Sequence, residues 1–418
     1  MQVVWSHVVA DVVREHAGAG LTKVAYGDAN MTTTTWVPSH RAPRVLDSSP
    51  LADAPGVTVH TTASPIIGRV LAAAAPMAAG DIAFSAHAFV SVLSTPHLLT
   101  HCHACFAKLR GRAVQCASCE RARYCDRTCM QDHLLLHDAQ CAALQALPTV
   151  DNDLVRLALS CLIMELATNN ASVLATLVVH AVPSKERQRY ERYAKLLLSH
   201  LPSLDRPRWL TPQHVLDVLL AVRFNAHPIV TDLHSSALGL GLFPDAAKMI
   251  NHACRPTTYP RFNTATRALE FRALQSMAPG ALLTYSYLDV FGFCLLEPRQ
   301  ARQQLLATTF GFDCVCGRCT SDDVLSHDDS ASLTPCDKLL AELDDAMARQ
   351  AWTTVVGVAS RLLVEWTERG LPDAYPLVYL LQTKLATAHM HLGAAPLAAS
   401  ATAAATAAAT ACGFEPAP

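Results

Sequence analysis

The sequence has little charge, few aromatic residues and no long hydrophobic run. Of its 418 residues, 16% are charged and 6% are aromatic, and the formal net charge is −2. A balance this close to zero gives no general field that would attract nucleic acid or an anionic membrane surface. The longest apolar runs, such as 70–79, fall well short of the roughly 20 residues that a membrane-spanning helix needs. We therefore expect neither a membrane-spanning chain nor a generally basic nucleic-acid-binding protein.

The sequence also lacks the features of a secreted protein. No positively charged segment followed by an apolar run and a cleavage site stands at its start. Its fifteen cysteines include tight C-x2-C pairs, which in a chain without such a signal favour reduced, metal-bound thiols over disulfides. With 51% hydrophobic residues, the chain can bury a sizeable core in two or three domains. We expect a globular protein of the cytoplasm, the nucleus or both.

Residues 102–141 hold eight candidate metal ligands in four pairs. A segment of 40 residues with few large apolar groups cannot fold on burial alone, and metal ligation can supply the missing free energy of folding. The ligands are Cys102, Cys105, Cys116, Cys119, Cys125, Cys129, His137 and Cys141. Four pairs suffice for two closed tetrahedral sites, which is the arrangement of structural zinc.

The spacing also indicates how these pairs divide. Cys129, His133, His137 and Cys141 recur every four residues, so on a helix Cys129 and Cys141 point about 120° apart, which suits two metal centres better than one. An interleaved pairing gives one ion to Cys102, Cys105, Cys125 and Cys129, and the other to Cys116, Cys119, His137 and Cys141. His133 competes with His137 as a ligand, and spacing alone does not decide between them.

The segments on either side have different patterns. Trp5, Val8, Val9 and Val12 follow helical spacing, which predicts an amphipathic helix over 2–15. The stretch 31–55 is rich in Thr and Pro and predicts a linker, so that 1–56 forms an N-terminal extension. Short apolar runs broken by Gly and Pro predict strands over 57–98.

Helical patterns follow the zinc-binding segment at 148–224, where Thr211-Pro212 is typical of a helix start, and return at 335–412. Between them, strand and turn patterns carry three motifs in order. They are Asn-His-x-Cys-x-Pro at 251–256, Leu-Thr-x-x-Tyr at 283–287 and Cys-x-Cys-x2-Cys at 314–319. The last run supplies three thiolates, and Cys254 is the natural fourth ligand of a tetrahedral site.

Together these motifs resemble the SET and MYND-domain (SMYD) family of protein lysine methyltransferases. The zinc-binding segment is similar to a MYND finger, in which Tyr-Cys-x3-Cys precedes His-x3-Cys, and Tyr124 stands before Cys125 as in that pattern. The Gly68-Arg69 pair before the finger and the three motifs after it are similar to a SET domain divided by the finger. The resemblance covers about 57–320. It implies an α+β fold, with a SET-type β core split by a zinc-binding MYND finger, a helical insert and a helical C-terminal region.

In this interpretation each segment has a defined place. The parts are a first SET part at 57–98, the finger at 102–141, the helical insert at 148–224, a second SET part at 225–309, a post-SET zinc motif at 310–320 and the C-terminal helical region at 335–412.

The resemblance implies transfer of a methyl group from S-adenosylmethionine to a lysine of a histone or another protein. Tyr287 would be the catalytic residue, with its hydroxyl near the methyl group and the incoming amine. The cofactor would be bound by Gly68, Arg69, Asn225, Asn251 and His252. The substrate channel would be lined by Tyr285, Phe310 and Phe312. A third zinc ion would be held by Cys254, Cys314, Cys316 and Cys319.

Some positions depart from the family pattern. The first loop has Ile66 and Val70 where the outer glycines stand and Ile67 at the usual basic position, and β-branched residues tolerate positive φ poorly. Phe310 replaces a frequent tyrosine and so loses one hydroxyl. Tyr285 adds a hydroxyl that can hold a water molecule and restrict the number of methyl groups transferred.

These departures keep a second function open, a zinc-stabilised interaction scaffold whose SET core has lost useful cofactor binding. A RING-type ubiquitin ligase would explain the interleaved zinc pairs but not the motifs of 225–320. The resemblance also implies a partner with a proline-containing peptide at the finger. Basic residues of the finger allow weak contact with DNA, although a solvated surface explains them equally well. We expect a monomer.

Overall fold

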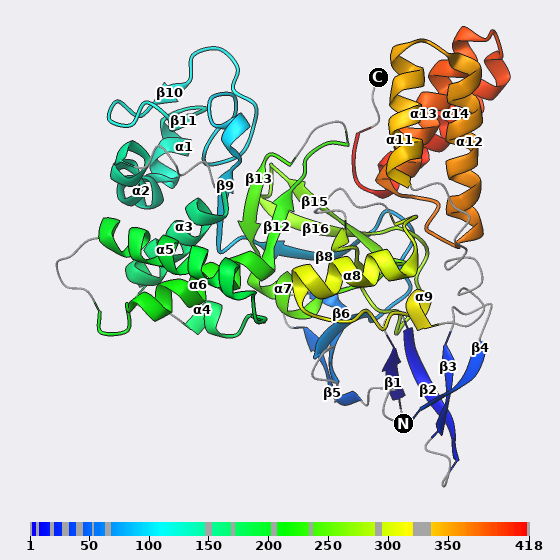
Figure 1. Cartoon of the computed structure of the whole chain (residues 1–418), viewed down its shortest axis with the longest axis horizontal. Helices are drawn as coiled ribbons and strands as arrows, with labels where there is room; N and C mark the ends of the chain where they lie inside the picture. Colours follow the sequence, from blue (N-terminus) through cyan, green and yellow to red (C-terminus); the bar gives the residue numbers. More distant parts are fainter. Residues whose placement is uncertain are drawn as a thin grey trace. The chain divides into compact units, whose positions relative to one another are not determined.

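The structure is a computed structural model (Figure 1), and it describes residues 2–5, 8–16, 21–26, 33–38, 45–51, 54–62, 68–146, 153–168, 172–201, 207–233, 237–288, 295–320 and 336–415. The chain forms two compact units. The first comprises Met1–Ser85, Met249–Arg261 and Glu270–Pro418, and the second comprises Ala86–Lys248 and Phe262–Leu269. Helices and sheets occur in both units, which confirms the predicted α+β class. No helix of the described residues is long and apolar enough to cross a membrane.

The N-terminal part of the first unit is built from strands. An antiparallel sheet has the order β1 (Gln2–Trp5), β2 (Val8–His16), β3 (Leu21–Tyr26) and β4 (Thr33–Pro38). The helix predicted over 2–15 is therefore wrong. The same window is rich in valine, whose branched Cβ favours extended backbone. A short apolar pattern does not distinguish the period of a helix from the period of a strand.

The predicted linker at 31–55 is also wrong. Besides β4, it contains β5 (Val45–Leu51) and the start of β6 (Ala54–Thr62). These two strands form an antiparallel sheet with β7 (Arg69–Ala73), in the order β5-β6-β7. The segment before residue 57 thus contributes strands to the sheet that contains β7, and its threonines supply residues that fit a strand surface.

The strands within 82–87 and 251–285 confirm the predicted strand and turn pattern. One three-stranded sheet has the order β15 (Thr258–Asn263), β16 (Ala268–Ala273) and β8 (Ile82–His87). A short parallel pair joins β14 (Asn251–His252) to β17 (Thr284–Tyr285), with Asn251 opposite Thr284. The backbone N–H of Leu283 donates to Leu71 O, which fixes the segment of the second motif on β7.

Two helices near the Cys-x-Cys-x2-Cys motif were not predicted. Helix α8 (Arg299–Phe310) ends at Gly311, whose φ of 72° is in the left-handed region that favours glycine. Helix α9 (Gly317–Thr320) follows within the cysteine motif. Together these two helices position the three cysteines of that motif.

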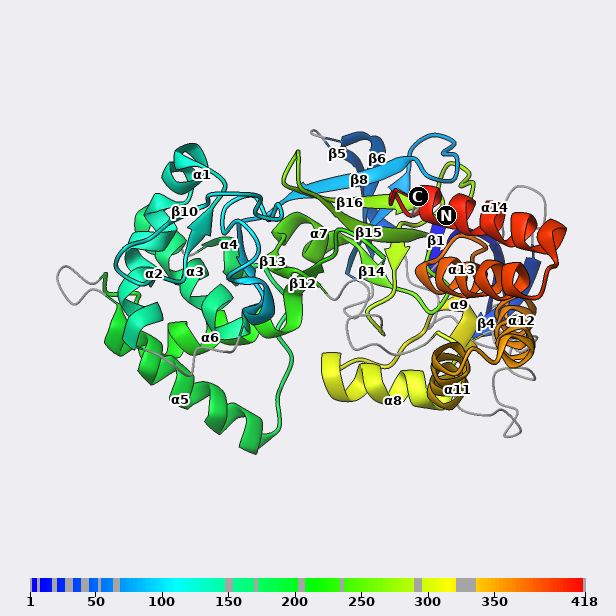
Figure 2. The same ribbon diagram turned by 90° about the horizontal axis from the view of Figure 1, so that it is seen from above.

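The C-terminal region is helical, as predicted. It consists of α11 (Cys336–Ala348), α12 (Trp352–Glu368), α13 (Pro376–His391) and α14 (Ala395–Ala411). Figures 1 and 2 show α13 and α14 side by side. The buried face of α14 is made of alanines such as Ala398, Ala401 and Ala405, and their small side chains allow neighbouring backbones to approach closely.

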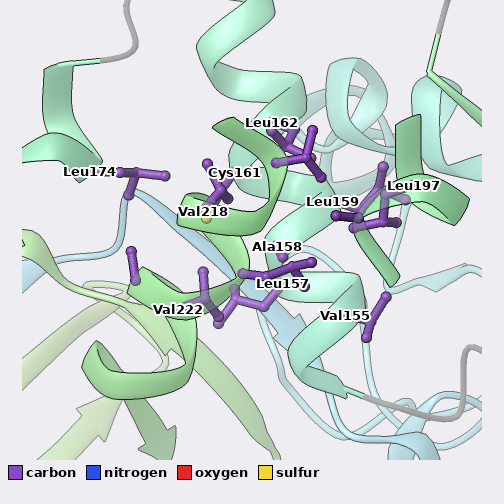
Figure 3. Packing of buried hydrophobic residues seen from close by; sticks show 14 of the residues in the cluster. Val155, Leu157, Ala158, Leu159, Cys161, Leu162, Leu174, Leu197, Val218 and Val222 are labelled. Atoms are coloured by element: carbon purple, nitrogen blue, oxygen red, sulfur yellow. The ribbon is translucent and has the colours of Figure 1, made fainter. Parts of the chain in front are cut away.

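The helical insert of the second unit is confirmed by α3 (Asp153–Thr168), α4 (Ser172–Ala175), α5 (Ser184–His200) and α6 (Pro212–Asn225). Thr211 caps α6 by accepting a hydrogen bond from His214 N, with Pro212 as the first helical residue. Figure 3 shows the apolar core between these helices, where Leu157, Leu162 and Leu197 are fully buried. Cys161 lies in the same core, which agrees with its predicted role as a buried apolar residue.

A three-stranded sheet of the second unit has the order β12 (Ala226–Ile229), β13 (Gly239–Leu242) and β9 (Val90–Leu93). A Cβ at Gly239 would overlap Val92 O, so this close strand pairing requires glycine there. The short helix α7 (Pro244–Met249) follows β13.

The finger in the second unit contains the strand pair β10 (Val114–Gln115) and β11 (Arg123–Tyr124), then α1 (Arg127–Asp132) and α2 (Leu134–Ala146). Figure 1 shows these elements together. The helical stripe expected from Cys129 to Cys141 is interrupted, because the backbone between α1 and α2 turns at His133.

Candidate active site and metal centres

The described residues of the finger bring the eight candidate ligands together in two groups. The first group is Cys102, Cys105, Cys125 and Cys129, and the second group is Cys116, Cys119, His137 and Cys141. Within each, the nearest ligand atoms lie within 4.8 Å of one another. Cys105 Sγ and Cys125 Sγ are 3.7 Å apart, as are Cys116 Sγ and Cys141 Sγ. Thiolates bound to one tetrahedral zinc ion at ~2.3 Å stand ~3.8 Å apart, so both groups fit that ion.

Local structure explains which histidine joins the second group. His137 Nε2 lies 3.8 Å from Cys119 Sγ. His133, at the turn between α1 and α2, has its Nδ1 3.1 Å from the Tyr124 hydroxyl, which leaves it outside the group. Burial lowers the pKa of His133 to about 3, so its ring stays neutral and can accept that hydroxyl. The geometry favours His137 where the spacing left the choice open.

The backbone of the finger also holds the ligands in place. Asp126 caps α1 by accepting a hydrogen bond from Cys129 N at 2.9 Å, which fixes the last ligand of the first group at a helix start. The strand pair β10–β11 sets Val114 opposite Tyr124, so that Cys116 and Cys125 each follow a paired strand. The short strand pair and the Asp126 cap thus orient ligands that the few apolar residues of the finger could not hold by packing alone.

A third group of four cysteines lies in the first unit. Cys254 lies two residues after the end of β14, whereas Cys314, Cys316 and Cys319 come from the segment after α8. Cys254 Sγ is 3.9 Å from Cys314 Sγ and 3.6 Å from Cys319 Sγ, again the separation of ligands on one tetrahedral zinc. All four side chains are buried. Hydrogen bonds from the Cys314, Cys316 and Cys319 thiols hold the pKa of Cys254 well below its ordinary value.

Tyr287, the predicted catalytic residue, is anchored to the segment around β14 at both ends. Its hydroxyl donates to Ile250 O at 3.0 Å, and its backbone N–H donates to His252 Nδ1 at 3.0 Å. Burial raises the pKa of Tyr287, so the phenol keeps its proton at neutral pH. Because that proton is donated to Ile250 O, the hydroxyl oxygen retains lone pairs that can accept a further weak donor.

The three residues predicted to line a substrate channel surround Tyr287. Its ring centroid lies 4.8 Å from that of Tyr285, 5.1 Å from Phe310 and 6.3 Å from Phe312. Burial and the neighbouring Tyr287 raise the pKa of Tyr285 well above its ordinary value. The group presents uncharged aromatic faces, and such faces attract a cation and form an apolar wall around a narrow chain.

Two of the predicted cofactor-binding residues, Asn251 and His252, form β14, and the His252 ring accepts a hydrogen bond from Tyr287 N. Asn251 Nδ2 donates to Arg69 O at 3.3 Å, which joins β14 to the start of β7. Gly68 has a φ of 60°, and no described atom lies within 4 Å of where its Cβ would stand. Ile66 and Ile67 lie outside the described residues, and Val70 is buried in β7.

Asn225 is placed differently from the other predicted cofactor residues. It ends α6 in the second unit, and its side chain donates to Val178 O and to Ala221 O, both at 2.8 Å. These bonds occupy its amide protons with backbone carbonyls of the helical insert.

Several residues around Tyr287 and the third group carry no signal in the sequence. Ile250 contributes only a backbone carbonyl, which any residue could supply. Arg302 and Arg318 are buried, and each donates to the third group: Arg302 Nη2 to Cys319 Sγ at 3.8 Å and Arg318 Nη1 to Cys254 O at 3.1 Å. Arg318 falls inside the predicted cysteine motif, but neither arginine has a spacing that would predict its role.

Comparison with known proteins gives a consistent result. The model of the SET domain family matches residues 68–288. The chain is 31% identical over 279 residues to the N-lysine methyltransferase SMYD2 of Mus musculus, which covers 61% of this chain and 59% of that protein. It is 26% identical over 272 residues to the histone-lysine N-methyltransferase Smyd1 of Mus musculus, covering 60% and 54%. The chain thus spans less than two thirds of the length of the curated relatives that it matches.

Proposed function

The chain belongs to the SET domain family, and from this premise we propose that it transfers a methyl group from S-adenosylmethionine to a lysine side chain of a protein. The observation that carries the proposal is the setting of Tyr287. A partly buried, protonated tyrosine, held at its hydroxyl and at its backbone, stands inside a group of aromatic rings beside the Asn251-His252 pair. This arrangement suits a reaction that needs alignment and a dry channel.

The chain's own residues would align the two reactants. S-adenosylmethionine, when bound, supplies an activated methyl group on a sulfonium. The Tyr287 oxygen would accept a weak C–H or N–H donor, since its proton is directed to Ile250 O. The rings of Tyr285, Phe310 and Phe312 would exclude water from the lysine chain, and a lysine amine in apolar surroundings more readily loses its proton.

Cofactor binding would use the backbone around β14 and the start of β7. Asn251 and the backbone at Gly68 and Arg69 would contact S-adenosylmethionine, because Asn251 Nδ2 already reaches Arg69 O and no described atom crowds Gly68. The His252 ring contacts Tyr287 N and Cys254 Sγ, so His252 would contact the cofactor through its backbone. We keep Asn225 in this set as a prediction from the resemblance alone.

Three zinc ions would stabilise the chain, two in the finger and one in the third group. The donor sets support this assignment, since each offers four thiolates or three thiolates and an imidazole at tetrahedral separations. With four protein ligands each, none of the sites would have a position for a reactive water. Their role would be structural, and the finger would be free to contact a proline-containing peptide.

The scaffold alternative is not favoured. It requires a SET core that has lost useful cofactor binding, whereas Tyr287 is hydrogen-bonded to Ile250 and His252, and the neighbouring Asn251 reaches Arg69 O. Both relatives described above are named as lysine methyltransferases.

Calorimetry with S-adenosylmethionine tests the proposal first. We expect binding by the wild-type chain and its loss in Asn251→Ala, since the amide would contact the cofactor. The absence of any heat from wild-type protein at millimolar ligand would refute the enzymatic function and leave the scaffold.

Methylation of a peptide array tests the catalytic residue. We expect Tyr287→Phe to lower kcat by about a hundredfold or more, because one preorganised polar group at the reacting centre is commonly worth that factor. Binding of S-adenosylmethionine should persist, since the ring remains. Tyr193→Phe, a tyrosine of the helical insert, is the matched control and should transfer methyl groups at the wild-type rate. Unchanged transfer by Tyr287→Phe would contradict the assignment.

The number of methyl groups transferred depends in this proposal on Tyr285. We expect Tyr285→Phe to increase the number added to one lysine, because the lost hydroxyl no longer holds a water molecule that restricts the amine. Mass spectrometry of the peptide product at full conversion measures the methylation state. An unchanged product distribution would remove Tyr285 from this role.

A further inference from the structure

Both ring nitrogens of His252 have partners. The backbone N–H of Tyr287 lies 3.0 Å from Nδ1, and Nε2 lies 3.3 Å from Cys254 Sγ. A backbone N–H can only donate, so Nδ1 is the acceptor and the proton of the neutral ring is on Nε2. That proton therefore faces the sulfur of Cys254. His252 is buried, with 6% of the residue's surface exposed.

On the side of Tyr287, the ring lies at the end of the pairing between β14 and β17. Ala253 N donates to Tyr285 O at 3.1 Å, and β14 pairs in parallel with β17 immediately before. The two strands separate after Tyr285, so the backbone N–H of Tyr287 no longer has a strand partner and takes His252 Nδ1 instead. The imidazole thus continues the connection between the two segments for two residues beyond Tyr285, up to Tyr287.

The Cys254 side belongs to the third group of cysteines. Other N–H donors also point at its sulfurs: Cys254 N at Cys316 Sγ, 3.5 Å away, and Arg302 Nη2 at Cys319 Sγ, 3.8 Å away. Four thiolates around one Zn²⁺ carry a net charge of −2, and N–H donors at the sulfurs stabilise such a charge in a buried site. Partners of this kind tune metal affinity by about 10- to 100-fold.

We propose that His252 is a positioning residue that connects the third group to Tyr287, so that a metal ion held by Cys254, Cys314, Cys316 and Cys319 fixes the backbone of Tyr287 through the imidazole. The metal holds Cys254, the Cys254 sulfur orients Nε2–H, and the ring then offers Nδ1 to the tyrosine. The effect on methyl transfer rests on the proposed function, whereas the link from metal to tyrosine does not.

Two substitutions of His252 each keep one of its two hydrogen bonds and remove the other. In His252→Asn, the amide oxygen occupies the place of Nδ1 and can still accept from Tyr287 N, but nothing reaches Cys254. In His252→Gln, the amide nitrogen occupies the place of Nε2 and can still donate to Cys254 Sγ, but the acceptor for Tyr287 is lost. The full chain, purified with zinc and without any methyl donor, is used for both.

Two measurements test the contact of His252 with Cys254 and its contact with Tyr287 separately. Zinc release to a chromogenic chelator reports on the third group, and hydrogen–deuterium exchange reports on the backbone amide of Tyr287. We expect His252→Asn to release one zinc at least tenfold faster with exchange at Tyr287 within twofold of wild type. We expect His252→Gln to do the reverse, with release within twofold of wild type and exchange at least tenfold faster.

Cys316→Ser identifies the release phase that belongs to the third group and tests the transmission. Cys336→Ser, a buried thiol outside the three groups, is its control and should leave release and exchange unchanged. We expect Cys316→Ser to speed exchange at Tyr287 at least tenfold in the wild-type background and to add less than twofold in the His252→Gln background, where the link is already broken.

Equal effects of Cys316→Ser in both backgrounds would overturn the proposal, as would variants of His252 that change neither release nor exchange. The kinetic consequence is read last: His252→Gln should lower kcat about tenfold with little change in the KM for S-adenosylmethionine. If the wild-type chain transfers no methyl group, the proposed function fails while release and exchange still decide on the link.

Discussion

His227 shows how burial alone changes the chemistry of a side chain in this protein. Its ring is buried in β12, and its Nδ1–H donates to Asn225 O at 3.1 Å. Burial lowers the pKa of His227 from its ordinary 6.5 to about 4. The hydrogen bond partly opposes that change but does not compensate for the lost hydration of the cation.

This difference predicts a loss of stability in mild acid. Between pH 6.5 and about 4 the unfolded chain takes up a proton at His227 that the folded chain refuses, so the stability present above pH 6.5 falls as the pH decreases through that window. The contribution is at most about 3 kcal/mol, at 1.36 kcal/mol for each pKa unit. Urea denaturation at several pH values measures it.

His227→Asn is the matched variant, because its amide can still donate to Asn225 O but does not titrate. We expect the variant to lose less stability than wild type between pH 6.5 and 4. Parallel pH curves for the two proteins would show that His227 is already charged in the fold.

The sequence predicted which candidate ligands lie together in the three groups, but it did not predict the polar contacts around them. Ligands such as Cys116 and Cys119 reveal themselves by spacing, because a tetrahedral ion accepts few chain geometries. The contact of Arg302 with Cys319 joins α8 to α9 and leaves no periodic trace in the sequence. The tautomer of His252 depends on the backbone N–H of Tyr287, 35 residues further along the chain.

Among the elements, the helices of the second unit owe their stability to one shared apolar core. Leu162 of α3 is fully buried and packs in the cluster that contains Leu197 of α5 and Val218 of α6 (Figure 3). Burial of such side chains is the main favourable term in holding helices of this length together, since isolated helices are marginal in water.

Leu162→Ala should lower the free energy of unfolding by about 2–5 kcal/mol, through lost burial and the cavity that remains. Urea denaturation followed by circular dichroism, in buffer with zinc, gives the change. Val178→Ala serves as the control, because 57% of its surface is exposed and its removal should cost less than about 0.5 kcal/mol. Similar losses for both variants would mean that the core tolerates the cavity.

The elements also differ in how far the sequence determined them. The insert was predicted because Thr211-Pro212 marks a helix start and because the apolar positions repeat over several turns. The N-terminal strands were missed because a short valine-rich window fits both periods. Helix α8 was missed because it has few apolar residues. Its buried residues are Leu306 and the charged Arg302.

For the chain as a whole, the three groups predict a zinc content. We expect three zinc ions per chain by elemental analysis of protein purified without added chelator. Single substitutions Cys125→Ser, Cys119→Ser and Cys316→Ser, one in each group, should each remove one ion. A wild-type content of two or fewer would show that one of the described groups is not a metal site.

The sheet β15-β16-β8 has a consequence for how the chain folds during its synthesis. Strand β8 leaves the ribosome about 180 residues before its partner β16. At roughly 5–20 residues per second, its edge stays without that partner for roughly 10–40 s. The finger and the helical insert are made in this interval and can fold on their own contacts. An unpaired edge is prone to aggregation, so chaperones should bind nascent chains that end between β8 and β16 more than they bind longer ones.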